Sequence, residues 1–119
     1  MTPKFNNIYN NLNESAYIET GIRQRRFRFF TEELLNLRKT YVDQIIELNQ
    51  KLNASNEYDH ELAKKIKRQK AQIKRINVYI EEMNKSMEVS SYQYTALTSK
   101  IWSFLIKRVW KLKHGRYHY

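Results

Sequence analysis

Two stretches of the chain between residues 31 and 87 repeat apolar residues at helical spacing, on either side of the polar break Asn53-Ala54-Ser55-Asn56. The recurring positions of the first stretch are Leu34, Arg38, Tyr41, Ile45, Leu48 and Leu52. Those of the second stretch are Leu62, Ile66, Gln69, Ile73, Ile76, Ile80, Met83 and Met87. Steps that alternate between four and three residues place each set on one seam of a helix. The pattern predicts two long helices over residues 31–88 that fold back about residue 57 as an antiparallel coiled-coil hairpin.

The start of the first predicted helix is marked by residues suited to a helix terminus. Thr31 can accept a hydrogen bond from a first-turn amide, and Glu32 and Glu33 complement the positive end of the helix dipole. Arg38 is the misfit of the first seam, while Gln69 in the second is a polar residue of the kind that fixes register when buried. We therefore expect the first helix to begin at Thr31.

Residues 1–30 are predicted to form an irregular N-terminal arm. Residues 1–20 are rich in Asn, which favours turns and caps, so one or two helical turns at most are expected there. In the next segment, IRQRRFRFF at 22–30, Phe27 and Phe29 would share one side of an extended chain. This alternation with arginine favours a short strand or an extended arm.

Two interpretations of the Arg/Phe segment remain open. The first makes the phenylalanines core residues at the open end of the hairpin, with the arginines solvated or paired with glutamates of the two helices. The second uses arginine for bidentate phosphate contacts and for stacking on bases. The arginines concerned are Arg23, Arg25, Arg26 and Arg28.

Residues 89–119 are predicted to form a basic, aromatic C-terminal helix and tail, capped by Ser90 or Ser91 and stopped by Gly115. This helix has more apolar surface than one exposed helix can carry, so it must pack on the hairpin, on another copy of the chain or on a bilayer surface. The residues predicted for a partner or oligomer interface are Trp102, Phe104, Ile106 and Trp110.

Composition supports one mostly α-helical domain. The chain has 119 residues with only two glycines and one proline, so it has few of the turn-forming residues that a β-rich fold needs. It has no cysteine, so disulfides and thiolate metal sites are excluded. No signal peptide or run of roughly 20 apolar residues is apparent. We expect a soluble protein of the host cytoplasm or the virion interior.

Net charge is the strongest global signal. The formal charge is +10, of which residues 91–119 carry +6. Between Leu62 and Ile80 there is no acidic residue. With the apolar seam fixed, five basic residues of this stretch are predicted to project outward along about 16 Å of helix, enough to follow a few successive phosphates: Lys64, Lys67, Arg68, Lys74 and Arg75. Lys65 and Lys70 flank the seam instead, where Asp43 and Glu47 could pair with them.

The sequence contains no pattern typical of an active site. Two glycines cannot build a phosphate-binding loop, and no Ser/His/Asp or Cys/His constellation can be assembled. His114 and His118 are four residues apart, but Gly115 lies between them and no third ligand is near. We predict a non-enzymatic protein with no metal site and no cofactor.

Two segments, IYNNLNESAYI at 8–18 and FFTEELLNL at 29–37, resemble the N-terminal part of the late-transcription regulators of small Bacillus podoviruses. The resemblance covers about 30 residues and implies a phage origin and DNA binding as a dimer through an N-terminal hook. That family has a basic base-reading residue just before the position of Ile8, where this chain has Asn6, and a mixed α/β remainder that this chain lacks. No residue role is therefore transferred.

We predict a phage-type nucleic-acid-binding protein that acts by largely sequence-independent phosphate contacts, with DNA favoured over RNA. The predicted contacts are Arg23, Arg25, Arg26, Arg28, Lys64, Lys67, Arg68, Lys74, Arg75, Lys107, Arg108, Lys111, Lys113 and Arg116. The alternative is a coiled-coil adaptor, virion assembly protein or phage inhibitor that binds an acidic protein surface. Homo-oligomerisation through the last helix and binding to an anionic membrane surface also stay open.

Overall fold

The computed structural model describes residues 3–114, with side chains described for residues 19–109 and for Lys111. In this range the chain forms α1 (Pro3–Ala54), α2 (His60–Asn84), the short 3-10 helix η1 (Ser86–Glu88) and α3 (Ser91–His114), and no strand. The predicted all-α class is confirmed. None of the described helices is both long and apolar enough to cross a membrane.

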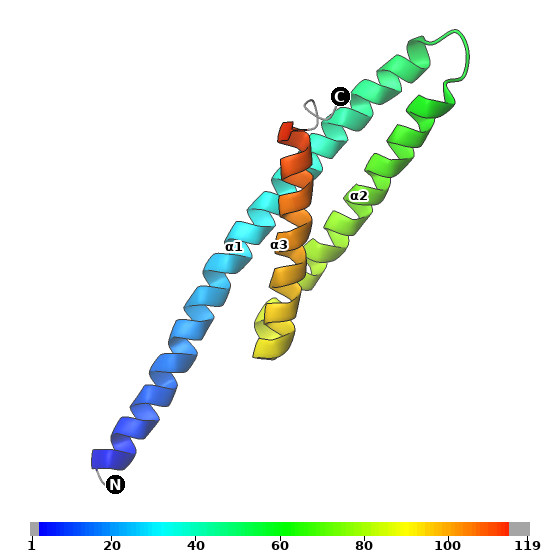
Figure 1. Cartoon of the computed structure of the whole chain (residues 1–119). Helices are drawn as coiled ribbons and strands as arrows, with labels where there is room; N and C mark the ends of the chain where they lie inside the picture. Colours follow the sequence, from blue (N-terminus) through cyan, green and yellow to red (C-terminus); the bar gives the residue numbers. More distant parts are fainter. Residues whose placement is uncertain (1–2, 115–119) are drawn as a thin grey trace.

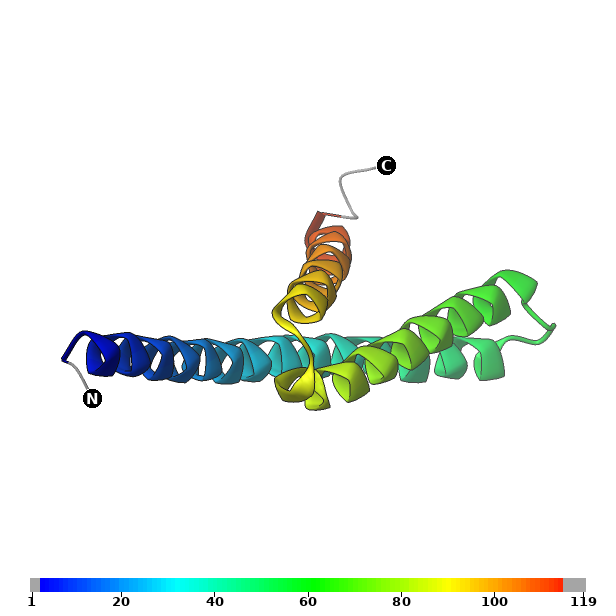
Figure 2. The same ribbon diagram turned by 90° about the horizontal axis from the view of Figure 1, so that it is seen from below.

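The three helices form an elongated molecule of 83 × 27 × 18 Å. Helix α2 runs antiparallel beside the C-terminal half of α1, and the N-terminal half of α1 extends beyond the end of α2 (Figure 1). Figure 2 shows that α3 leaves the layer formed by α1 and α2. The helices therefore meet near the middle of α1, at the end of α2 that lies away from the 55–59 turn.

The core lies at this three-helix junction. Leu34 of α1, Ile76 of α2 and Ile101 of α3 are fully buried there, and the rings of Tyr79 and Phe104 meet edge-on with centroids 5.2 Å apart. The buried cluster comprises Phe30, Leu34, Leu37, Tyr41, Ile76, Tyr79, Met83, Ile101, Phe104 and Leu105. Toward the 55–59 turn Ile66 is still buried, but Ile45, Leu48, Leu52 and Leu62 are only half-buried, so α3 supplies much of the cover that makes the junction a core.

The turn between α1 and α2 lies where the sequence predicts it. The Asp59 carboxylate caps α2 by accepting hydrogen bonds from the amides of Glu61 and Leu62, at 3.0 and 3.1 Å. Across the pair of helices, the guanidinium of Arg38 donates to the side-chain oxygen of Asn77 at 2.7 Å. Arg38, the predicted misfit of the seam, therefore has a polar partner on the facing helix.

The predicted irregular arm is wrong, because α1 begins at Pro3 and residues 22–30 lie inside it. Arginine is a good helix former, and at helical spacing Phe27 and Phe30 fall on the face of Leu34, where all three pack into the core. An extended chain would have grouped Phe27 with Phe29 instead. Packing of Phe27, Phe30 and Leu34 into the core therefore stabilises the helical conformation of this segment over the extended one. Thr31 is accordingly an interior residue of α1 and not its cap.

The second corrected boundary is the end of α2. This helix ends at Asn84, and Met87, which the heptad pattern placed on the seam, lies in η1 with 40% of its surface exposed. A capping box then starts α3: the Gln93 amide donates to the Ser90 hydroxyl at 3.2 Å, and the Ser90 amide donates to the Gln93 side chain at 3.3 Å. Gly115, the predicted stop, lies outside the described residues.

Candidate nucleic-acid interface

Five of the seven exposed basic residues of α2 lie on the side of the helix opposite the seam and are here called the α2 stripe. All are exposed, whereas Ile66, Ile76 and Met83 of the same helix are buried. The members of the α2 stripe are Lys64, Lys67, Arg68, Lys74 and Arg75. The heptad spacing explains this division, because residues on the side of the helix opposite the seam cannot reach the core.

The α2 stripe has little intramolecular charge compensation. Lys64 lies 3.8 Å from the Glu61 carboxylate, and both side chains are well exposed, so this pair is weak. In the described part of the chain no other member has a carboxylate within salt-bridge distance. The predicted pairing of Lys65 and Lys70 with Asp43 and Glu47 is not found there either, and Glu47 lies 3.4 Å from Lys51 on its own helix instead.

Helix α3 adds cations beside α2. Lys100, Lys107 and Lys111 recur at steps of seven and four, so they share one side of α3, and each is exposed. The Lys100 ammonium lies 5.8 Å from the centre of the Tyr79 ring, which shows that this side faces α2. Arg75 lies one turn before Tyr79 on α2. The Arg75 end of the α2 stripe and Lys100 of α3 therefore border the same junction.

The remaining predicted contacts on α3 differ in accessibility. Arg108 is half-buried, with its guanidinium 5.5 Å from the centre of the Phe104 ring. Its charge acts on Tyr41, although burial is the larger influence and raises the pKa of that phenol. Lys113 has no described side chain, and Arg116 lies outside the described residues.

The arginines of α1 divide into one buried and three exposed side chains. Arg25, Arg26 and Arg28 are exposed, and none has an ion pair among the described residues. Arg23 retains only 8% of its surface. Its predicted role in phosphate binding is therefore corrected, because its guanidinium is engaged within the protein.

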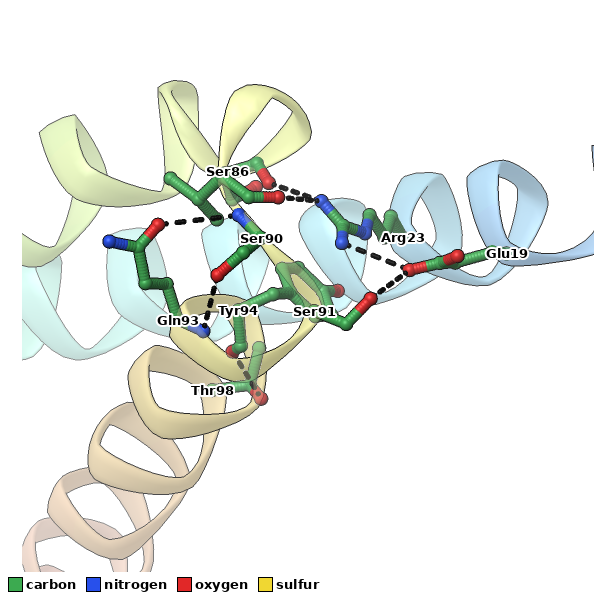
Figure 3. A network of polar contacts seen from close by, with 9 residues as sticks. Glu19, Arg23, Ser86, Ser90, Ser91, Gln93, Tyr94 and Thr98 are labelled. Carbon is green, nitrogen blue, oxygen red and sulfur yellow. Dashed lines mark hydrogen bonds and ion pairs between the residues drawn. The ribbon is translucent and has the colours of Figure 1, made fainter. Parts of the chain in front are cut away.

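Figure 3 shows what engages Arg23. The guanidinium donates to the main-chain oxygen of Ser86 at 3.0 Å and to that of Val89 at 2.8 Å, both in the segment between α2 and α3. It also pairs with the Glu19 carboxylate at 3.0 Å and lies 4.6 Å from the centre of the Tyr94 ring. One side chain of α1 thus holds the connection from which α3 departs.

Glu19 extends the same network to α3. Its carboxylate accepts a hydrogen bond from the Ser91 hydroxyl at 2.7 Å. This bond and the ion pair with Arg23 hold the pKa of the Glu19 carboxyl below its ordinary value of 4.5. Burial raises the pKa of the Tyr94 phenol, against the opposing charges of Arg26 and Arg23. The first turn of α3 is therefore fixed to α1 by polar contacts.

The residues of the predicted partner interface differ in their exposure. Phe104 is buried in the core of its own chain and is not available to a partner, which corrects that assignment. Trp102 and Ile106 lie on the opposite side of α3 from the lysines, each 47% exposed. The Trp110 side chain is not among those described.

An open hollow of about 600 Å³ lies between α1 and the end of α2. Arg28 and Glu32 both border it, together with Phe27 and Met87. Opposite charges share its rim, so it lacks the single-sign character of the α2 stripe. In the described residues no group of three or more histidine, cysteine or acidic side chains could hold a metal ion.

Comparisons of this chain with protein-family models, with curated proteins and with solved structures found no match.

Proposed function

We propose that the chain is a nucleic-acid-binding protein whose affinity comes from sequence-independent phosphate contacts. The observation that carries this proposal is the α2 stripe, an exposed and nearly uncompensated row of cations whose Arg75 end lies one turn from Tyr79, the ring that Lys100 of α3 contacts. Cations that replace condensed counterions along a phosphate backbone gain affinity mainly by releasing those ions. DNA is the favoured ligand, and the N-terminal resemblance to phage transcription regulators supports that choice.

We propose that α1 and α2 act as a coiled-coil scaffold for this surface. The alternating steps of four and three residues on both helices support a coiled-coil seam, and the hydrogen bond from Arg38 to Asn77 fits the register obtained by folding about residue 57. A rigid scaffold keeps the stripe straight along about 16 Å, so that several phosphates can be contacted together.

A second candidate is an adaptor that binds an acidic protein surface. The observation that favours it is the exposure of Trp102 and Ile106, since large apolar side chains on the surface often mark protein contacts. In that case the basic residues would steer association, and the apolar residues would supply most of the affinity.

The decisive experiment is a titration of labelled duplex DNA, single-stranded DNA and RNA over a range of salt concentrations. The test variant reverses Arg68, Lys74 and Arg75 to Glu. The matched control reverses Lys39, Lys51 and Lys85, which are exposed on other parts of the surface, to Glu. Because both variants reverse three basic residues, they have the same net charge. We expect the wild-type protein and the control to bind near physiological salt with a steep salt dependence. The test variant should lose duplex binding while keeping its helicity.

The slope of the salt dependence gives a second measurement. For duplex DNA the log-log slope changes by roughly 0.9 for each phosphate that the protein no longer neutralises. Equal binding by the test variant and the control would overturn the proposed role of the α2 stripe. Wild-type binding that disappears at moderate salt would instead favour the adaptor, because a general attraction to polyanions is all that would remain.

A further inference from the structure

An aromatic pair lies on the surface where α1 meets α3. The rings of Phe29 and Trp102, from positions far apart in the chain, have centroids 6.1 Å apart, and both pack against Phe30, at 5.4 and 6.3 Å. Phe30 is buried, but Phe29 and Trp102 remain 44% and 47% exposed. Two helices thus present adjoining aromatic rings to solvent on a buried aromatic base.

The exposure of this pair is not a general property of aromatic residues at the junction. Phe30, Tyr79 and Phe104 are each less than 10% exposed, so the fold has room to bury rings. Leaving parts of a phenylalanine and a tryptophan in water forgoes hydrophobic stabilisation. Their contact with Phe30 also restrains the rings, which lowers the entropic cost of binding a planar ligand.

Cations lie immediately beside this pair. Arg25 and Arg26 precede Phe29 by four and three residues, so they occupy the neighbouring turn of α1, and both are exposed. The acidic residues of α1 nearest to Phe29, Glu32 and Glu33, are one turn beyond it in the other direction. The surface is therefore basic on one side of the aromatic pair, a combination that suits a base attached to its phosphate.

We propose that Phe29 and Trp102 form a stacking platform for unpaired bases, with Arg25 and Arg26 contacting the adjoining phosphates. The two rings touch each other, so bases stack on their outward faces and not between them. Bases of a duplex are already stacked and cannot use such a platform, so the ligand it selects is a single strand. This inference rests on the proposed function only in taking nucleic acid as the ligand. It concerns the α1–α3 flank, not the α2 stripe.

The platform predicts a fluorescence signal. The chain has two tryptophans, so a Trp110→Phe variant leaves Trp102 as the single reporter. Stacking of a thymine on the indole should quench its fluorescence as a short oligothymidylate is added. A blunt duplex of the same length should leave the fluorescence unchanged.

Substitutions then measure the contribution of each ring. By anisotropy of a labelled oligothymidylate, Phe29→Ala and Trp102→Ala should each weaken single-strand binding by between about 5-fold and 100-fold. Duplex binding should stay within 2-fold of wild type. Trp102→Phe should retain most of the affinity because it keeps an aromatic face. Ile106→Ala is the matched control, since Ile106 is equally exposed but has no ring to stack.

The possible results distinguish failure of the stacking platform from failure of nucleic-acid binding through the α2 stripe. If the wild-type protein binds duplex and single strand but shows no quenching and no weakening in the alanine variants, the platform is overturned while the α2 stripe stands. If it binds neither, the proposed function itself fails. If Trp102→Ala changes the mass of the protein in light scattering but not its affinity for the oligonucleotide, the aromatic pair is a contact between copies. Circular dichroism of Phe29→Ala and Trp102→Ala verifies that each variant is folded.

Discussion

Arg23 connects three segments through a single guanidinium. Charged hydrogen bonds to the main-chain oxygens of Ser86 and Val89 satisfy it where the side chain is buried. Burying an arginine is favourable only when its donors find partners, and removal of the arginine leaves those oxygens without them. The residue therefore serves the fold, although in the sequence it stands among arginines that are exposed.

We expect Arg23→Ala to lower the free energy of unfolding by about 2 kcal/mol or more, the range for losing hydrogen bonds of a buried charge. Urea denaturation followed by circular dichroism measures the change. Arg25→Ala is the control and should remain within about 0.5 kcal/mol of wild type, since an exposed residue without a partner contributes little. Equal stabilities of the two variants would contradict the role assigned to Arg23.

Glu19 makes this connection sensitive to acid. Its pKa in the folded protein is lowered, first by the hydrogen bond from Ser91 and then by Arg23. A carboxyl whose folded pKa lies below its unfolded value stabilises the fold above that unfolded value, near 4.5, and the contribution disappears as the pH falls through the folded pKa. We expect stability to decline below pH 4.5, and Glu19→Gln to show a shallower decline in thermal melts from pH 6 to pH 3. A variant with an unchanged pH profile would contradict this.

At the scale of the helix, Gly21 tests whether α1 is continuous. It lies in the interior of α1 with no positive φ, and a Cβ added there would meet no atom within 4 Å. Replacing glycine by alanine in a helix interior usually stabilises by about 0.5–1 kcal/mol. We expect Gly21→Ala to raise stability by that amount in urea denaturation, and Gly21→Pro to lower it strongly and reduce helicity. If neither substitution changed the stability or the helicity, an irregular N-terminal arm would be favoured over a continuous helix.

The helices that the sequence predicts well are those with a sustained seam. The end of α1 at Ala54 follows from the polar break at residues 53–56, and the start of α2 at His60 lies close to the predicted fold about residue 57. The N-terminal half of α1 could not be predicted, because local propensity of Asn and the Arg/Phe alternation both favour other structure. Helical packing of Phe27 and Phe30 against α2 and α3 overrides them.

The candidate surfaces could be predicted from the sequence only where they depend on a single helix. The exposure of the α2 stripe could be predicted, because the apolar seam of one helix determines which of its residues point outward. The difference between Arg23 and Arg25, or between Phe29 and Phe30, could not, since it depends on where α3 crosses α1. That crossing brings together residues far apart in the chain, and no periodicity within one helix specifies it.

For the molecule as a whole, the arrangement gives two separate basic flanks on either side of α3. The lysine side of α3 borders α2, and its tryptophan side borders the arginines of α1. Neutralising the basic residues beside α2 should therefore weaken duplex binding more than single-strand binding. Neutralising the arginines of α1 beside Trp102 should do the reverse. The duplex and single-strand titrations described above read the two flanks separately.

The length of α1 makes a prediction about shape. A helix of 52 residues spans about 78 Å, and the Cα radius of gyration is 21.3 Å, whereas a compact chain of this size would have about 13.5 Å. Small-angle X-ray scattering of the monomer, with its mass verified by light scattering, should give a radius near 21.3 Å. Gly21→Pro should reduce it, because an interrupted α1 can bend toward the hairpin. A wild-type radius near that of a compact chain would show that the N-terminal half of α1 does not extend beyond the hairpin.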